Sequence, residues 1–496
     1  MALEKGRSGR FASPGWSIPL LGIALLLVFL VTSTVAPTLT ASVASNSEPA
    51  KLPSQLATNK DWPTYLGNIN RTSNSTGEKW LTPGNADKLA VNWTFTAGQI
   101  LPNGSAAVSN AIASSTMVVD GIAYVGSWNG YEYALDVTTH AIVWSTYLGI
   151  DSFDAKCGDN PSTGGTNEIG ISSAPTLFNG TLYLGANNAT GGVDAAFYAL
   201  NASTGRILWS VPTGNMSDGY YSWASPLIYD GYAYVGIASN CDQPLVQAGL
   251  DQINLQTNLT TTSHLVVHRF NTMPNRSGKE VIGASIWSSP SVDPENNTIF
   301  VTTGNPVSKI EVGPQNYSES VIALNATTLQ LESWWQVPQS EVVGDGDFGV
   351  DATVIHDVTV GGKSETLVVA GNKDGYFYAW NASDIGRGPL WALKMDKMKT
   401  QIITPAAYGG GLIYVDTPAL TINGATAAGG TFALYPNNGT IVWDNVLPGR
   451  GIGAPLYANG VIIAGAGRFM QVFNATTGTL YTSLESPGYF VSAPSI

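Results

Sequence analysis

Residues 121–144 read GIAYVGSWNGYEYALDVTTHAIVW, and versions of this stretch recur along the chain. Apolar and polar residues alternate with a period of two, and short turns separate the segments, which is typical of β-strands. Each copy holds a V-Y-V-G strand, a Y-A-L-N/D strand, a turn and, in most copies, a strand that ends in Trp. The other copies include residues 180–209, 321–335, 376–391, 431–443 and 470–481. The chain is therefore expected to be all-β and built from one repeated unit.

A strand of small residues precedes each copy, so the unit has four strands, A to D. The A strands begin near Ser109, Ser172, Ala224, Ser288, Asp351, Thr404, Gly453 and Ser492, at intervals of roughly 40 to 65 residues. Four antiparallel strands repeated in this way are the signature of β-propeller blades. The Trp residues that recur at the ends of the D strands are expected to pack between blades.

The number of strands predicts an eight-bladed β-propeller. The first D strand is VNWTF (91–95), and the last A strand is FVSAPSI (490–496). Pairing these two segments in one blade would close the ring. That blade has no B or C strand, so we expect seven complete blades and one that is incomplete at the C-terminus. Either further residues complete it or the ring closes imperfectly, and the sequence leaves both open.

The composition narrows the class of protein. The 496 residues include 55 Gly, 14 Trp and 21 Tyr, which suits many short strands joined by tight turns. Charged residues make up 11% of the chain, well below the roughly 25% of an ordinary soluble domain. The net charge is −13, and there is no basic stretch beyond the N-terminus. This balance argues against nucleic acid as a partner.

The N-terminus predicts export. Basic residues precede an apolar run over about 18–35, a pattern typical of a signal peptide or a membrane anchor. ASVA (41–44) could be a cleavage site, so both readings of residues 1–36 stay open. A Ser/Thr/Pro-rich tether, 37–58, would lead into a propeller over 59–496, secreted or held at the extracellular face of the membrane. The sequon N-x-S/T occurs 16 times, which suits a glycosylated exterior protein.

The repeat resembles that of the enzymes that use pyrroloquinoline quinone (PQQ). Residues 61–95, 125–136 and 346–380 are similar to the polyvinyl-alcohol dehydrogenase-like branch of that family. The resemblance covers nearly all of residues 60–496 and implies a β-propeller. Members of the family include quinoprotein alcohol dehydrogenases and also cofactor-free propellers that act as assembly scaffolds.

Propeller geometry indicates which face carries function. Because neighbouring strands alternate in direction, the D–A links between blades and the B–C loops within blades emerge on one face. The long insertions 239–263, 304–318 and 416–430 are B–C loops, and GDGDFG (344–349) is a D–A link. Irregular loops on a rigid scaffold are where binding and catalytic residues concentrate. The face that carries these loops is therefore the candidate functional face.

The resemblance implies four site residues on that face. In the family, calcium polarises a quinone carbonyl, and an aspartate takes the proton of the alcohol as hydride leaves for the cofactor. Asn305 in VTTGNP matches a calcium ligand, Asp347 in GDFG matches the catalytic base, and Lys373 in GNKDG matches the residue that contacts the quinone oxygens. Trp287 in SIWSSP matches the aromatic on which the cofactor stacks. Each residue also has a structural reading, as a turn, a cap, a hairpin residue or core.

The sequence departs from the family pattern in places. The family's Glu ligand should fall within 186–195, where Asp194 is the sole acid, so the implied metal ligands are Asn305, Asp347 and Asp194. Cys157 and Cys241 fall on the candidate functional face, and an oxidising exterior would favour a disulfide between them. The family's lanthanide-using branch has an extra Asp two residues after the base; Gly349 stands there, so calcium is expected. There is no CxxCH motif, so an enzyme would need a separate electron acceptor.

Two functions stay open from the sequence. The first is an exported alcohol dehydrogenase that uses PQQ and calcium to oxidise small alcohols. The second is a non-catalytic extracellular propeller that binds proteins or glycans through its loop-rich face. Convergence of Asn305, Asp347 and an acid such as Asp194 above Trp287 would favour the enzyme.

Overall fold

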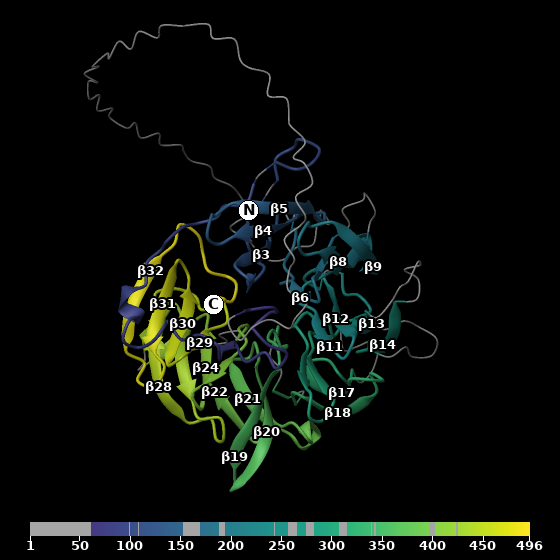
Figure 1. Cartoon of the computed structure of the whole chain (residues 1–496). Helices are drawn as coiled ribbons and strands as arrows, with labels where there is room; N and C mark the ends of the chain where they lie inside the picture. Colours follow the sequence, from purple (N-terminus) through teal and green to yellow (C-terminus); the bar gives the residue numbers. More distant parts are fainter. Residues whose placement is uncertain are drawn as a thin grey trace, which may run out of the picture. The chain divides into compact units, whose positions relative to one another are not determined.

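The computed structural model consists of seven antiparallel sheets arranged as blades around a central axis (Figure 1). It describes residues 61–496 apart from 99, 108, 152–168, 188–193, 243, 256–264, 274–281, 307–314, 339, 342–343, 396–401 and 423–424. The expected signal or anchor (1–36) and tether (37–58) lie outside the described residues. Within the described ranges, no helix has the length and apolar character that a membrane span requires.

The first four blades follow one another along the chain, each in the strand order A-B-C-D. Blade 1 consists of β2 (Met117–Val119), β3 (Ile122–Gly126), β4 (Tyr131–Asp136) and β5 (Ile142–Tyr147), and blade 2 of β6 (Thr176–Phe178), β7 (Thr181–Ala186), β8 (Asp194–Asn201) and β9 (Ile207–Asn215). Blade 3 consists of β11 (Leu227–Tyr229), β12 (Tyr232–Ser239), β13 (Gly249–Asn254) and β14 (Val266–Asn271), with β10 (Tyr220–Tyr221) paired to the end of β12. Blade 4 consists of β15 (Ser291–Asp293), β16 (Thr298–Thr302), β17 (Ser320–Asn325) and β18 (Leu331–Gln336).

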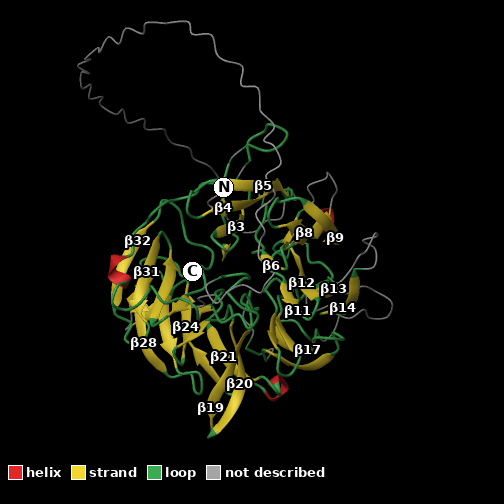
Figure 2. Ribbon diagram, viewed as in Figure 1, coloured by secondary structure: helices red, strands yellow, loops and turns green. Residues whose placement is uncertain are grey.

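The remaining blades repeat this order. Blade 5 consists of β19 (Thr353–Val360), β20 (Lys363–Gly371), β21 (Tyr376–Asn381) and β22 (Trp391–Lys394), and blade 6 of β23 (Ala407–Gly409), β24 (Leu412–Thr417), β27 (Gly430–Leu434) and β28 (Ile441–Val446). Blade 7 consists of β29 (Leu456–Ala458), β30 (Val461–Ala466), β31 (Phe469–Asn474) and β32 (Leu480–Glu485). The B–C loop of blade 6 holds the hairpin of β25 (Leu420–Ile422) and β26 (Ala425–Ala427). Figure 2 shows how strands dominate; the described helices are the short η1 (Ala86–Lys88), η2 (Met216–Asp218) and η4 (Ile385–Arg387).

The recurring Trp and Gly residues join neighbouring blades. Trp144, at the D strand of blade 1, donates its indole N–H to the carbonyl of Ala202 in blade 2 at 2.8 Å. Gly205, in the turn after Ala202, has a φ of +69°, and a Cβ there would lie 2.5 Å from the Trp144 ring. The turn between strands C and D of one blade thus packs against the Trp side chain of the preceding blade. The same pairing recurs at Trp391 with Gly439 and at Trp443 with Gly478.

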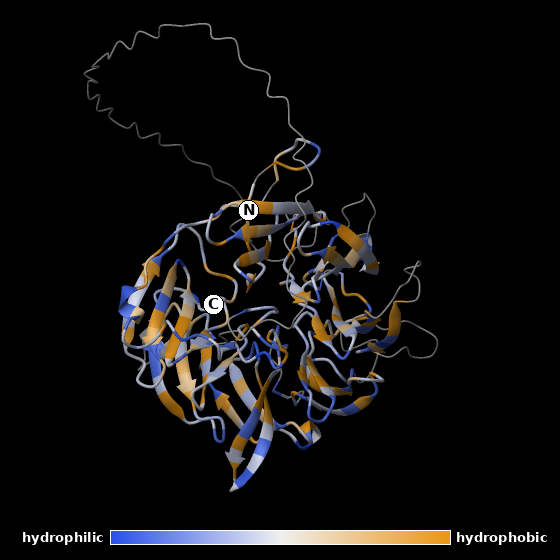
Figure 3. Ribbon diagram, viewed as in Figure 1, coloured by the Kyte–Doolittle hydropathy of each residue, from blue (hydrophilic) through white to orange (hydrophobic). Residues whose placement is uncertain are grey.

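The core lies between the blades. Apolar side chains recur along the strands all around the ring (Figure 3), because strands with a blade on either face bury both sets of alternating side chains. The largest cluster packs blade 5 against its neighbours and includes Phe348, Trp380 and Phe377, all fully buried.

The prediction of eight blades was wrong, because the segments expected to form the eighth do not form strands. Residues 91–95 and 490–496 make no ladder with each other or with a neighbour. Trp93 and Phe95 instead pack against apolar side chains of blade 1. In the last segment, Ala493 N–H donates to Ser115 Oγ at 3.0 Å. With no B and C strands between them, the two segments have no strand ladder to join, so the unit has seven blades.

The ring is closed from the inside by the entry segment 62–75. This segment bonds through its backbone to the inner strands of six blades in turn, with contacts from Trp62 to Val118, Pro63 to Leu177, Ile69 to Val292, Asn70 to Val354, Thr72 to Tyr408 and Ser73 to Tyr457. Its end, β1 (Asn74–Ser75), pairs in parallel with β29. The bonds satisfy inner-edge N–H groups that would otherwise lack protein partners.

Arg71 makes side-chain hydrogen bonds that connect the entry segment to blades 3 and 4. Its side chain is fully buried and donates four hydrogen bonds, at 2.7 to 3.2 Å. The acceptors are the carbonyls of Tyr65, Pro226 and Pro290 and the hydroxyl of Thr64. Because Pro226 and Pro290 precede the A strands of blades 3 and 4, this single guanidinium fixes both blades to the axis.

Candidate functional site

A cluster of charged and amide side chains lies on the face formed by the D–A links and B–C loops. Lys373, in the B–C turn of blade 5, places its ammonium 2.6 Å from Asp347 Oδ1 and 2.9 Å from Asp345 Oδ1. Both carboxylates belong to the link from blade 4 to blade 5. The backbone supports the pair, because Lys373 N–H donates to the Asp347 carbonyl at 3.0 Å.

Asn305 extends this cluster toward blade 3. It lies in the B–C loop of blade 4, and its Nδ2 donates to Asp345 Oδ1 at 2.8 Å and to Asp242 Oδ2 at 3.1 Å. Asp242 belongs to the B–C loop of blade 3. Loops of three successive blades therefore contribute to one site, which contains Asp242, Asn305, Asp345, Asp347 and Lys373; we call these five residues the acidic cluster.

The last three residues of the GDFG sequence have different roles. Asp347 is 1% exposed and faces Lys373. Phe348, pointing the other way, is fully buried in the core of blade 5. Gly349 approaches Trp287 so closely that a Cβ there would lie 2.8 Å from the indole ring. The motif thus anchors the link in the core while it presents one carboxylate to the face.

Trp287 lies beside the acidic cluster. It belongs to the link between blades 3 and 4, and the Lys373 ammonium lies 4.9 Å from the centroid of its ring. This is within the range of a cation–π contact. The structure therefore brings Trp287, Lys373 and the buried carboxylate of Asp347 together.

The two carboxylates that flank Lys373 differ in their protonation. Burial raises the pKa of Asp347 to about 7, and the charge of Lys373 opposes that rise. Burial also acts to raise the pKa of Asp345, but the hydrogen bond from Asn305 and the charge of Lys373 outweigh it and hold the value below the ordinary one. Asp345 is therefore ionised at neutral pH, whereas Asp347 exchanges its proton near neutrality, as an acid–base group must.

Two predicted residues have other outcomes. Asp194 begins β8, opposite Asn215 in the register, and the hydrogen bonds and ion pairs described for the acidic cluster do not include it. Asp242, which the sequence analysis did not single out, is instead an acid that contacts Asn305, at 3.1 Å. It could have been found as an acid in a B–C insertion on the same face. Cys241, its neighbour, is disulfide-bonded, and Cys157 lies outside the described residues.

The donor set suits a hard cation. Asp242, Asp345 and Asp347 offer carboxylate oxygens, and Asn305 has an amide oxygen while its nitrogen holds two of those carboxylates in place. Calcium takes six to eight such oxygen ligands, several of them from water. The backbone of Gly304 approaches Asp347 closely, because a Cβ there would lie 3.2 Å from Oδ2. The residues present therefore fit a calcium ion more closely than a metal that prefers nitrogen or sulfur.

Two family models match parts of this chain. Residues 264–405, which carry most of the acidic cluster, match the family model "Glucose/ethanol/alcohol dehydrogenase, beta-propeller domain". Residues 374–486 match the model "Outer membrane protein assembly factor BamB". Residues 264–405 thus resemble the propeller domain of PQQ-dependent dehydrogenases. This resemblance was predicted from the sequence and is confirmed.

This chain is similar to several quinoprotein dehydrogenases. It is 23% identical over 360 residues to quinoprotein alcohol dehydrogenase PedH of Pseudomonas putida, covering 66% of the chain and 56% of that protein. It is 23% identical over 406 residues to polyvinylalcohol dehydrogenase of a Pseudomonas species, covering 73% and 56%. The chain thus spans little more than half of each relative.

A solved structure supports the fold alone. The quinohemoprotein alcohol dehydrogenase of Comamonas testosteroni superimposes with a TM-score of 0.69 at 18% identity, over 88% of this chain and 74% of that one. At this identity the superposition establishes a common β-propeller architecture, and the chemistry must be argued from the acidic cluster.

Proposed function

We propose that this protein is an exported quinoprotein that oxidises small alcohols with PQQ and calcium. The observation that carries the proposal is the contact network through Asp345. This one carboxylate accepts from Asn305 at 2.8 Å and from Lys373 at 2.9 Å, and Lys373 pairs with Asp347 at 2.6 Å. Three residues selected for their separate roles in a quinoprotein are thus joined in one site.

Asn305 and Asp347 would hold the metal ion. Asp242 and Asp345 lie within reach of the same amide and would complete an oxygen-rich site with water. Gly349 stands where the lanthanide-using enzymes have a further acid, so calcium is the proposed ion. When bound, calcium and PQQ supply the electrophilic quinone that accepts hydride from the alcohol carbon. Trp287 would give the flat cofactor an apolar surface to stack on.

Asp347 would take the proton of the alcohol hydroxyl. With a pKa of about 7, its carboxyl is partly ionised at neutral pH and fully ionised above it. The Lys373 ammonium, 2.6 Å away, stabilises the ionised form and fixes its position. Since only the ionised form accepts a proton, kcat/KM should fall as the pH is lowered through the pKa of Asp347 in the loaded enzyme, where bound calcium would favour the ionised form and place that pKa below its metal-free value.

Reconstitution tests this function. The purified chain is loaded with PQQ and Ca²⁺ and given a primary alcohol and an artificial electron-accepting dye, because the chain carries no haem motif of its own. We expect alcohol-dependent reduction of the dye that Asp347→Asn lowers by at least a hundredfold. Asp384→Asn is the matched control, since that carboxylate is half exposed and forms an exposed ion pair with Arg387. Equal activity of Asp347→Asn and the wild-type protein would contradict the role of Asp347.

A non-catalytic extracellular propeller is the second candidate. It is favoured by the position of Lys373, whose ammonium already neutralises Asp345 and Asp347 without a metal ion. In that case the acidic cluster would be a structural clasp between the loops of blades 4 and 5. Reconstituted protein that binds no PQQ would support this candidate over the enzyme.

A further inference from the structure

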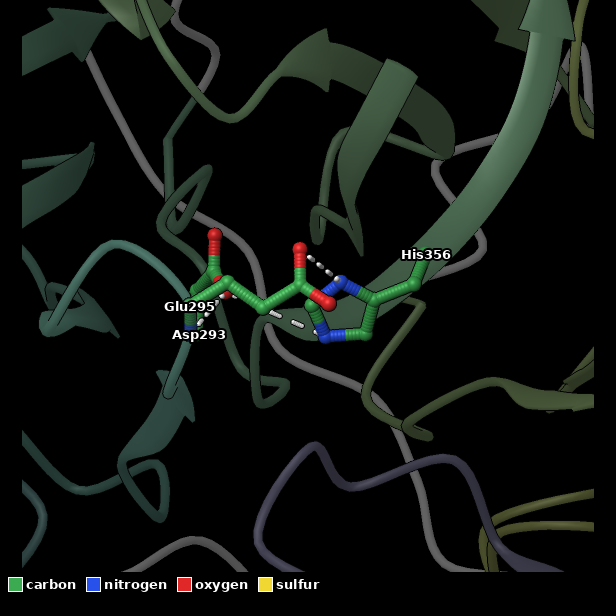
Figure 4. Close-up of side chains that lie close together, drawn as sticks. All are labelled: Asp293, Glu295 and His356. Atoms are coloured by element: carbon green, nitrogen blue, oxygen red, sulfur yellow. Dashed lines mark hydrogen bonds and ion pairs between the residues drawn. The ribbon is translucent and has the colours of Figure 1, made fainter. Parts of the chain in front are cut away.

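A second group of metal-ligating side chains lies where blades 4 and 5 meet, away from the acidic cluster. Asp293 ends the A strand of blade 4, Glu295 follows in the A–B turn, and His356 lies on the A strand of blade 5. One ligand atom from each lies within 4.8 Å of the others. Figure 4 shows the two carboxylates on one side of the His356 ring, each facing one ring nitrogen. The A–B turns emerge on the side of the ring opposite the D–A links and B–C loops.

The structure holds the His356 ring in the form that binds a metal. Asn70 Nδ2, which can only donate, lies 3.2 Å from His356 Nε2, so this ring nitrogen is an acceptor without a proton. The orientation of the amide is fixed because Nδ2 also donates to the Val292 carbonyl at 2.8 Å. The proton is then on Nδ1, which lies 3.2 Å from Thr366 Oγ1 and donates to it. A ring nitrogen held by a second partner is the usual setting of a ligating histidine.

Asp293 is held in the same manner. It is fully buried, and its Oδ1 accepts from the Glu295 backbone N–H at 3.0 Å while Oδ2 accepts from Asn296 Nδ2 at 2.7 Å. Oδ1 also lies 3.9 Å from His356 Nε2. A β-bulge in the pairing of β19 with β20 falls at His356 and directs the side chain away from the regular ladder.

The separations suit a small transition-metal ion once Glu295 moves toward Nε2. Asp293 Oδ1 lies 3.9 Å from His356 Nε2, whereas Glu295 Oε2 lies 3.9 Å from the other ring nitrogen, Nδ1. Two ligands of a tetrahedral zinc ion, at bonds of about 2.0–2.1 Å, lie about 3.3–3.4 Å apart. The Glu295 side chain is 72% exposed and free to swing inward, while the other two ligands are fixed by their partners. Binding would replace the bond from Asn70 to Nε2, and Asn70 would keep its bond to Val292.

We propose that Asp293, Glu295 and His356 form a structural site for a divalent transition-metal ion such as Zn²⁺, with water completing its coordination. One imidazole and two carboxylates favour such an ion over calcium, which takes oxygen ligands. The bound ion links the A–B turn of blade 4 to the A strand of blade 5, beside the entry segment at Asn70. This site is independent of the proposed PQQ chemistry.

Zinc titration of the chelator-treated full chain tests the site. Isothermal calorimetry in excess Ca²⁺, which competes for the oxygen-rich acidic cluster, should detect one Zn²⁺ site per chain. Affinity should fall at least tenfold in His356→Ala and in Glu295→Gln. Glu295 is exposed, so the second variant does not put folding at risk. His268→Gln, which changes an exposed histidine on β14, is the control and should bind as the wild type does.

X-ray absorption of the zinc-loaded protein should show one imidazole nitrogen and otherwise oxygen ligands. That signature distinguishes the proposed site from zinc held by the acidic cluster, which contains no histidine. Absence of Zn²⁺ binding by the wild-type chain would overturn the proposal. Unchanged affinity in either ligand variant would overturn it as well.

Discussion

Arg71→Met should be the most damaging single substitution in the entry segment. The Met side chain keeps much of the apolar volume but removes four hydrogen bonds. Burial lowers the pKa of Arg71 to about 10, so the guanidinium is still charged at neutral pH and these bonds are charge-assisted. The variant would leave the carbonyls of Tyr65, Pro226 and Pro290 without their donor.

The expected loss follows from those carbonyls. Each buried acceptor left without a donor costs about 1–3 kcal/mol, so three cost about 3–9 kcal/mol. Water that enters the vacated space would recover part of this, and we expect a loss of about 4 kcal/mol. The buried Asp351 adds little to this loss of stability. Burial raises the pKa of Asp351 to about 7 although the charge of Arg71 opposes the rise. Once that charge is removed, the carboxyl would bind a proton and carry no unpaired charge. The predicted loss is a large share of the 5–15 kcal/mol typical of a folded protein.

Urea unfolding followed by Trp fluorescence measures this effect. The midpoint of Arg71→Met should shift to clearly lower urea at an unchanged slope. Arg387→Met is the matched control, because that side chain is 86% exposed and forms a surface ion pair with Asp384, and it should change stability by less than about 0.5 kcal/mol. A loss below about 1 kcal/mol for Arg71→Met would refute the view that the entry segment closes the ring through Arg71.

Three further predictions test other parts of the structure. Gly439→Ala should destabilise the protein by about 1–3 kcal/mol in thermal unfolding, because φ is +69° and a Cβ would lie 2.6 Å from the Trp391 ring. Unchanged stability would show that the close contact between this turn and Trp391 does not matter for folding. Burial raises the pKa of Asp416 to about 8, so its contribution to stability is present below the ordinary pKa near 4 and is lost as the pH rises toward 8. Asp416→Asn should therefore reduce the change in unfolding free energy with pH, measured by urea unfolding, by several kcal/mol. Equal pH dependence of stability in the variant and the wild type would contradict this. Lys373→Met should raise the pKa of Asp347 further, because it removes the positive charge beside that carboxylate. Infrared titration of the carboxyl should show an upward shift in pKa of at least one unit. An unchanged pKa would mean that Lys373 does not stabilise the ionised form of Asp347.

The repeat predicted most of the fold because its signals are local. Alternation, TG turns and the terminal Trp each depend on a few neighbouring residues, and Trp144 with Gly205 shows that the motif also specifies the contact between blades. The number of blades, in contrast, is not determined by such local signals. Residues 91–95 have the pattern of a strand but lack a partner, and a strand forms only when its backbone groups are paired. The ring segment 62–75 acts mainly through backbone bonds, which leave little trace in side-chain pattern.

The site was predicted only in part for a similar reason. Asn305, Asp347 and Lys373 lie in short motifs, GNP, DFG and NKDG, whose likeness to a family is visible in the sequence. Asp242 and Asp194 lie in loops of different blades, and only the folded ring decides which of them reaches Asn305. It is Asp242, at 3.1 Å.

Equilibrium binding of PQQ tests the central claim most directly. Quenching of Trp fluorescence is titrated with PQQ in the presence and absence of Ca²⁺, for the wild-type protein and for Asn305→Ala. The account predicts one PQQ per chain, tighter by at least tenfold with Ca²⁺, and a loss of that Ca²⁺ dependence in Asn305→Ala. Wild-type protein that binds no PQQ with or without Ca²⁺, or that binds it with no effect of Ca²⁺, would contradict the claim that the acidic cluster is a quinoprotein site.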